Sequence, residues 1–240
     1  MAHLGHAYEH VYMMVPVVAA MYGSFAPAYE IVKVNEGGYA NDPVDKGGET
    51  YAGIARNIFP TWEGWGHVDR KKSRYAKGVI PTNTKFSDLD FLVTRFYQGL
   101  WDKYRYGEIN SQIVANLMFD FAVHSGPSNA NTAMQRIIGV TADGVMGSAT
   151  LAAINKGNEQ QIYAALLAAR KAFLEKVITN NSGYEKYREG FAKRLAQFEQ
   201  FMQTPGGIGT GIITVLSIAS MIALFIWYQS ESKTKRLKST

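Results

Sequence analysis

The chain has 240 residues, of which 47% are hydrophobic, and this content is enough to bury one sizeable core. It contains no cysteine, which excludes disulfides, thiolate metal sites and cysteine nucleophiles, so any catalysis has to use carboxylates, hydroxyls or histidine. The formal net charge of +5 favours an anionic partner, without selecting among nucleic acid, phospholipid headgroups and bacterial wall.

Residues 1–23 form an N-terminal extension, and an apolar stretch runs from Met13 to Ala28. The stretch could be the core of a signal peptide, but residues 1–12 contain no lysine or arginine. Two interpretations remain: an atypical cleaved signal, or a segment that packs on the domain or on a partner, and the second fits the pattern better. In that case we expect another route of export, with a phage tail or secretion machine as partner.

Residues 28–35 are predicted to form a helix that delivers Glu36 to a glycine-rich turn. The following segment, 37–57, contains five glycines, one proline and two aspartates. These residue types favour turns and a short β-hairpin over a helix. We call this segment the wing.

Most of the rest of the soluble part is predicted to be helical, because apolar residues recur at spacings of three and four. One helix is expected to begin at Ser111, and Ser128 and Ser148 are expected to cap two others. The predicted helices are 87–104, 111–125, 129–138, 149–154, 158–179 and 184–203. The expected fold is therefore mainly α, an α+β lysozyme-like helical lobe with a small wing and a cleft between them.

The segment 208–228 has 21 residues without Asp, Glu, Lys or Arg. A helix of this length rises about 30 Å and spans the hydrocarbon core of a bilayer. A buried core helix is the alternative, but Pro205 and two glycines separate the segment from the preceding helix. The tail 229–240 is basic, so we expect a single-pass membrane protein with a cytoplasmic C-terminus and its main domain outside.

Hydrolysis of a glycosidic bond needs a carboxylic acid to protonate the leaving oxygen, and usually a second carboxylate. Glu36, Asp45 and Thr50 supply an acid, a second carboxylate and a hydroxyl around the wing. Burial of Glu36 would raise its pKa, whereas Asp45 lies in a polar turn and should stay ionised. The apolar neighbours expected to desolvate Glu36 are Ile31, Val32 and Val34.

Other residues are candidates for binding substrate. Tyr39, Asp42, Gly47 and Gly48 lie in the wing, and Asn116, Asp120 and His124 follow one another at intervals of four on one helix face. The second group either lines the cleft or satisfies buried polar groups. Trp62 and Trp65 could stack on sugars, while Trp101, Gln135 and Asp143 are expected to be structural. His124 with Glu36 or Asp120 offers too few ligands for a metal, and we expect no metal or cofactor.

The sequence NEGGYANDPVDKGGETYAGIA resembles the signature of the glycoside hydrolase family 108 muramidases. In this resemblance Glu36 matches the catalytic glutamate, and Asp45, Gly47, Gly48 and Thr50 match the D-x-G-G-x-T turn. The segment from Leu100 to Asn155 resembles the peptidoglycan-binding region that follows in that family. The resemblance implies a catalytic region at 24–108 and a helical peptidoglycan-binding region at 109–204, whereas the two ends of the chain depart from the family's layout.

The sequence therefore predicts a membrane-anchored lysozyme that cleaves peptidoglycan after N-acetylmuramic acid. Two alternatives remain: a lytic transglycosylase acting on the same substrate, and a wall-binding membrane anchor without activity. Nucleic acid is not expected as a partner, because the basic cluster from Arg70 to Arg74 stands alone.

Overall fold

The computed structural model describes residues 23–42 and 47–203. Three expected features lie outside these ranges: nearly all of the N-terminal extension, Asp45, and the transmembrane segment 208–228 with its basic tail. Among the described residues, no helix combines the length and the apolar composition that are needed to cross a membrane.

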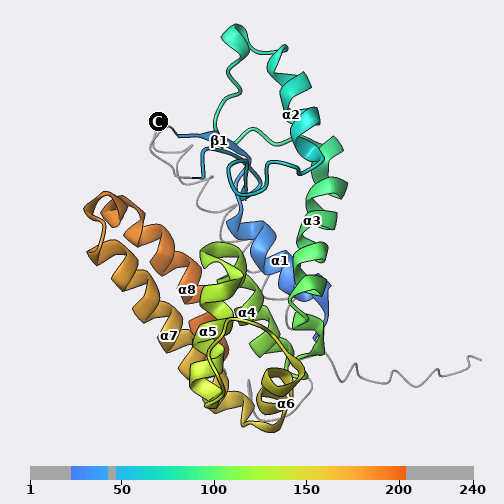
Figure 1. Cartoon of the computed structure of the whole chain (residues 1–240). Helices are drawn as coiled ribbons and strands as arrows, with labels where there is room; N and C mark the ends of the chain where they lie inside the picture. Colours follow the sequence, from blue (N-terminus) through green and yellow to red (C-terminus); the bar gives the residue numbers. More distant parts are fainter. Residues whose placement is uncertain (1–22, 43–46, 204–240) are drawn as a thin grey trace, which may run out of the picture.

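The wing is a three-stranded antiparallel sheet, which lies between the large helical part and the segment around α2 (Figure 1). Its strands follow chain order: β1 (Tyr39–Asn41), β2 (Glu49–Tyr51) and β3 (Ile54–Ala55). Tyr39 pairs with Tyr51, and Thr50 pairs with Ala55. Successive side chains of a strand point to opposite faces, so the two tyrosines share the buried face and Thr50 lies on the other.

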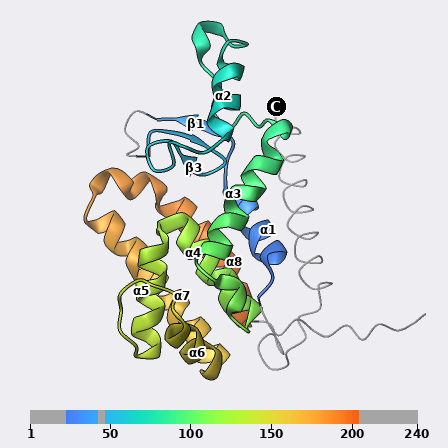
Figure 2. The same ribbon diagram turned by 45° about the vertical axis from the view of Figure 1, so that its right-hand side comes forward.

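Three helices surround the wing. α1 (Phe25–Asn35) precedes it, α2 (Gly64–Lys72) follows it, and α3 (Asp90–Lys103) extends from the wing into a larger helical part (Figure 2). The larger part contains α4 (Gln112–Ser125), α5 (Pro127–Ile138), α6 (Ser148–Lys156), α7 (Glu159–Thr179) and α8 (Arg188–Gln203). Short 3-10 helices are η1 (Ala76–Gly78), η2 (Ser87–Leu89), η3 (Tyr106–Glu108) and η4 (Ser182–Tyr187).

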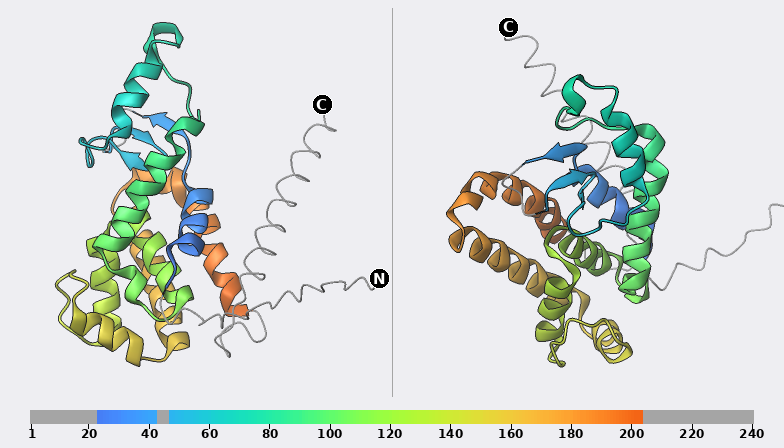
Figure 3. Two further views of the ribbon diagram at one scale, coloured as in Figure 1. Left: turned by 90° about the vertical axis from the view of Figure 1, so that its right-hand side faces the viewer. Right: turned by 45° about the horizontal axis from the view of Figure 1, so that its top comes forward.

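Helix α4 lies at the centre of the helical part. Every residue from Ile113 to Ala122 is buried, as expected for a helix that is apolar on most of its faces. It contacts the next helix along the chain, α5, and also α1 and α7, which are distant in the sequence, so three helices pack around it. The two views in Figure 3 show the wing at one end of this helical part, with α3 extending along both. α4 can therefore connect groups on α1, α7 and α8.

The expected mainly helical fold with a small glycine-rich wing is confirmed. α4 starts within one residue of the predicted position, and Ser111 caps it, because its hydroxyl accepts a hydrogen bond from the N–H of Val114 at 3.3 Å. The two predicted caps are wrong. α5 begins at Pro127, whose fixed φ suits a first helical position, and α6 begins at Ser148, so Ser128 and Ser148 lie inside their helices.

Helix α2 was not predicted from the sequence. It contains Gly64 and Gly66, which weaken the helical pattern. In the structure the basic cluster from Arg70 to Arg74 begins in the last turn of α2, where cations interact favourably with the helix dipole.

Candidate active site

Glu36 lies where α1 ends and the chain turns into β1. Its backbone is extended, and its N–H donates to the carbonyl of Val32 at 3.0 Å, which closes the last turn of α1. The side chain is 14% exposed. Val32 is fully buried as expected, but Val34 is 49% exposed. The burial of Glu36 therefore depends on groups outside its own helix.

The turn between β2 and β3 lies beside one oxygen of the Glu36 carboxyl, Oε2. Gly53 lies in this turn with a φ of +77°, and a Cβ atom there would overlap Glu36 Oε2. The preceding residue is fixed by α3, because the hydroxyl of Tyr97 donates to the carbonyl of Ala52 at 2.7 Å. Only glycine allows the wing backbone to approach the carboxyl this closely.

The other oxygen of Glu36 accepts hydrogen bonds from Arg194 on α8. Arg194 Nη1 and Nη2 lie 3.1 Å and 3.0 Å from Glu36 Oε1. The same guanidinium donates to Asp120 on α4, with Nη2 2.8 Å from Oδ1 and Nε 3.0 Å from Oδ2. One cation thus bridges two carboxyls from distant parts of the chain.

A second arginine completes the cluster. Arg170 on α7 is fully buried, and its Nη2 lies 2.5 Å from Oδ2 of the equally buried Asp120. The cluster of Glu36, Asp120, Arg170 and Arg194 contains two acidic and two basic groups. Charges can be buried at such a site because each has a partner of opposite sign.

The environment moves the pKa values of the two carboxyls in opposite directions. Burial raises the pKa of Glu36 above its usual 4.5, and Arg194 only partly opposes this shift. Burial also acts to raise the pKa of Asp120, but Arg194 and Arg170 outweigh it and lower this pKa to about 2. Glu36 is therefore the carboxyl suited to hold a proton, and Asp120 stays ionised.

The other wing residues predicted for the site lie on either side of residues 43–46, which are outside the described ranges. Asp45 itself is outside the described residues. Asp42 Oδ2 lies 3.8 Å from Lys186 Nζ, so the wing approaches the end of the hairpin that α7 and α8 form. Gly48 has a φ of +68°, and the carbonyl of Gly47 accepts from the N–H of Asn57 at 3.2 Å.

Three of the predicted substrate-binding residues are buried and require a correction. Tyr39 is 4% exposed, and its hydroxyl donates to Glu49 at 2.8 Å, so its ring packs inside the wing. Asn116 is 2% exposed and accepts from Gln112. Asp120 has no exposed surface, so it positions Arg194 instead of contacting a substrate.

Several aromatic and polar residues are structural. Trp62 and Trp65 are 8% and 3% exposed and pack edge to face, so neither offers a free face to a sugar. Trp101 lies in the core as expected, and Gln135 donates to Asp143 at 2.7 Å, which confirms their structural assignment. Within the described ranges, no group of three or more acidic or histidine side chains could hold a metal ion.

Sequence reasoning missed Arg194 and Arg170. Both lie on the apolar stripe of their helix, Arg194 next to Leu195 and one turn before Phe198. A cation at a core position is the signal that was available, because an arginine is rarely buried without a carboxylate partner.

Two family models match consecutive parts of the chain. Residues 29–126 match the model described as glycosyl hydrolase 108, and residues 129–196 match the model described as a predicted peptidoglycan domain. Among solved structures, Brucella abortus SagA is similar, with 27% sequence identity and a TM-score of 0.55 over 76% of this chain and 97% of that chain. No curated protein matches the chain. These matches support a glycoside hydrolase that acts on peptidoglycan.

The ion-pair cluster generates a prediction about stability. Asp120→Asn should destabilise the protein at neutral pH by about 3–5 kcal/mol, because two buried guanidiniums lose their carboxylate. The folded pKa of Asp120 is about 2, below the usual 3.8, so its stabilisation is complete above pH 3.8 and is lost as the pH falls through about 2. Urea unfolding at pH 7 and at pH 3 should therefore show a smaller difference from wild type at pH 3.

Asp69→Asn is the matched control. Asp69 also pairs with basic groups, Arg56 and Lys72, but its side chain is 48% exposed. Its loss should cost about 0.2–1 kcal/mol, as for other surface pairs. The role of the buried cluster would be contradicted if the two substitutions lowered the free energy of unfolding equally. It would also be contradicted if the loss caused by Asp120→Asn did not change with pH.

Proposed function

We propose that the chain is an N-acetylmuramidase, which hydrolyses the bond between N-acetylmuramic acid and N-acetylglucosamine in peptidoglycan. The observation that carries this proposal is the Glu36 carboxyl, which lies beside the wing turn with a pKa that burial raises. The match to the glycosyl hydrolase model supports an enzyme, and the match to the peptidoglycan model supports the substrate class.

The two oxygens of the Glu36 carboxyl have different neighbours and therefore different roles in proton transfer. Oε1 accepts two N–H groups from Arg194, whereas Oε2 faces the turn at Gly53. A proton on Oε2 leaves both Arg194 bonds intact, so Oε2 is the oxygen from which the leaving sugar oxygen is protonated. After the transfer, Arg194 stabilises the carboxylate that remains.

A water molecule then has to attack the sugar carbon, and we assign its activation to Asp45 with Thr50. Asp45 lies in the chain between β1 and β2, next to the turn that Gly47 and Gly48 shape. Thr50 lies on the face of β2 opposite the buried Tyr51, so its hydroxyl is not part of the wing core. This arrangement supports hydrolysis with a second carboxylate and a hydroxyl that orient water.

A lytic transglycosylase is the second candidate. It would use Glu36 in the same way, but it would need no water-activating partner and would leave 1,6-anhydro ends on the products. A wall-binding anchor without activity is disfavoured, because such a protein has no need for a buried acid with a raised pKa.

We also propose that residues 208–228 anchor the enzyme in a membrane with its domain on the wall side. The support is the uncharged stretch of 21 residues and the basic tail that follows it. The N-terminal extension remains the candidate contact for a phage tail or secretion machine.

The central prediction concerns the acid. Glu36→Gln keeps the shape of the side chain but cannot donate the proton, so release of reducing ends from purified peptidoglycan should fall by at least the roughly 10²- to 10⁴-fold typical of general acid catalysis. Glu30→Gln is the matched control, because Glu30 lies on the exposed face of the same helix. If the Glu36→Gln protein releases reducing ends at nearly the wild-type rate, the proposal is contradicted.

Mass analysis of the same digests separates the two candidate reactions. For the hydrolase, all new ends are reducing, and Asp45→Asn loses most of the rate because an amide is a poor base. Anhydro ends, together with a fully active Asp45→Asn protein, would assign the reaction to the transglycosylase.

The membrane proposal predicts a topology. In cells that carry the full chain, protease added on the wall side should remove the domain and leave a tag placed after Thr240 protected, because the tail is basic. A tag that is digested from outside while the domain stays intact would reverse this orientation.

A further inference from the structure

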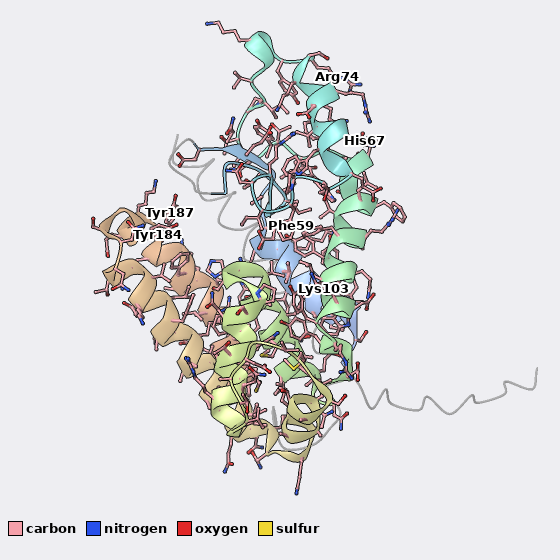
Figure 4. All side chains as sticks on the ribbon, in the orientation of Figure 1. Phe59, His67, Arg74, Lys103, Tyr184 and Tyr187 are labelled. Carbon is pink, nitrogen blue, oxygen red and sulfur yellow. The ribbon has the colours of Figure 1, made fainter. Side chains whose placement is uncertain are left out.

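A cavity of about 750 Å³ lies between α4, α7, η4 and α8. Six of the residues that line it determine its chemistry: His124, Ser125, Phe173, Tyr184, Tyr187 and Phe191. Tyr184 and Tyr187 belong to the turn between α7 and α8, at the end of this hairpin nearer the wing (Figure 4). The mechanism proposed above uses none of these six residues.

Two helices connect the cavity with the cluster around Glu36. On α4, His124 follows Asp120 by four residues, and on α8, Phe191 precedes Arg194 by three. Residues at these spacings share a helix face. The rings of His124 and Phe191 touch, with centroids 5.0 Å apart. The faces of α4 and α8 that carry Asp120 and Arg194 therefore also carry two residues that line the cavity, His124 and Phe191.

The rim of the cavity approaches the wing. Lys186 lines the cavity, and its Nζ lies 3.8 Å from Oδ2 of Asp42, the last described residue before the Asp45 turn. The wing therefore lies beside the cavity at Lys186. On its other side, the cavity is lined by residues of α4 and α8. Glu36 itself does not line the cavity, and the faces of α4 and α8 that carry Asp120 and Arg194 connect the two places.

The lining combines aromatic faces with unpaired polar groups. Tyr187 lies between Tyr184 and Phe191, with ring centroids 5.5 Å and 6.2 Å away. His124 Nδ1 and Ser125 Oγ are buried and have no hydrogen-bond partner among the described residues. A ligand that bonded to either group would relieve the cost of an unpaired buried polar atom.

The imidazole of His124 is uncharged at neutral pH. Burial lowers its pKa to about 3, and the nearby Arg194 and Arg170 act in the same direction. A neutral imidazole offers one donor and one acceptor, which suits an amide or hydroxyl better than an anion.

We propose that this cavity is a saccharide subsite, which holds an N-acetylated sugar of the glycan strand beyond the bond that Glu36 cleaves. This inference rests on the proposed function. Tyr187 stacks on Phe191 and has Lys186 Nζ 4.9 Å from its ring centroid, so its exposed edge packs against the sugar. His124 and Ser125 bond the acetamido group of that sugar. Concave sites with mostly apolar walls and a few converging polar groups are typical of such ligands.

The peptide stem of peptidoglycan is a less suitable occupant. Its carboxylates need cations, and Lys186 is the one cation among the described residues that line the cavity. Lys186 already lies close to Asp42, which offsets its charge. A neutral sugar requires no further cation.

The test measures binding in the full chain carrying Glu36→Gln, so that the ligand is not consumed. The probes are chitotetraose, a peptide-free chain of N-acetylglucosamine, and a free stem peptide, each followed by calorimetry. Tyr187→Ala should weaken chitotetraose binding by about 3- to 10-fold, the effect of losing one aromatic contact. Tyr187 is 38% exposed, so the fold should tolerate the change, and Tyr187→Phe should keep the affinity.

Phe91→Ala is the control, because Phe91 is 68% exposed on α3 and takes no part in the site. Equal affinities in the Tyr187→Ala and Phe91→Ala proteins would overturn the subsite, and so would a loss confined to the stem peptide. Binding does not depend on cleavage, so these outcomes are distinct from a failure of the proposed muramidase, which would appear as normal activity in the Glu36→Gln protein.

Discussion

The pairing of Arg194 with two carboxyls is the interaction on which the rest of the candidate site depends. Its guanidinium is 8% exposed and bonds both Glu36 and Asp120. A cation this deeply buried is stable only with its partners in place, so α1, α4 and α8 have to pack together before Glu36 reaches its position. Arg170 neutralises the charge left on Asp120. The result is a glutamate that is fixed by hydrogen bonds and still has a raised pKa, because burial outweighs the nearby cation.

The same interaction connects the two matched regions into one structural unit. Glu36 and Asp120 lie in the glycosyl hydrolase region, and Arg194 lies near the end of the peptidoglycan region. The second region therefore contributes directly to the acid, in addition to any role in holding the wall. Its α8 helix carries Arg194 toward Glu36 and Phe191 toward the cavity, so positioning of the acid and binding of the strand depend on one helix. The wing completes the arrangement by placing Gly53 beside the other oxygen of the carboxyl.

The sequence predicted the groups whose partners are local and missed those whose partners are distant. Glu36 could be predicted because a helix end and a glycine-rich turn adjoin it in the chain. The position of Arg194 on an apolar stripe indicates a buried cation, but its contact with Glu36 could not be predicted, because 158 positions separate the two residues. The spacing of apolar residues predicted α4 and α7. It did not predict α2, because two glycines weaken the helical pattern there. Residue type alone could not tell that Tyr39 faces the wing core, because strand register decides which face a side chain occupies.

The central claim is that the fold keeps the Glu36 carboxyl protonated to a higher pH than an ordinary glutamate, despite its contact with Arg194. Carbon NMR of the glutamate carboxyls across a pH titration measures this directly, with the Glu36→Gln protein identifying the signal. The account predicts one glutamate that titrates above the usual 4.5 and whose signal is missing from the Glu36→Gln spectrum. A Glu36 signal that titrates at or below 4.5 would show that Arg194 outweighs burial and would contradict the account.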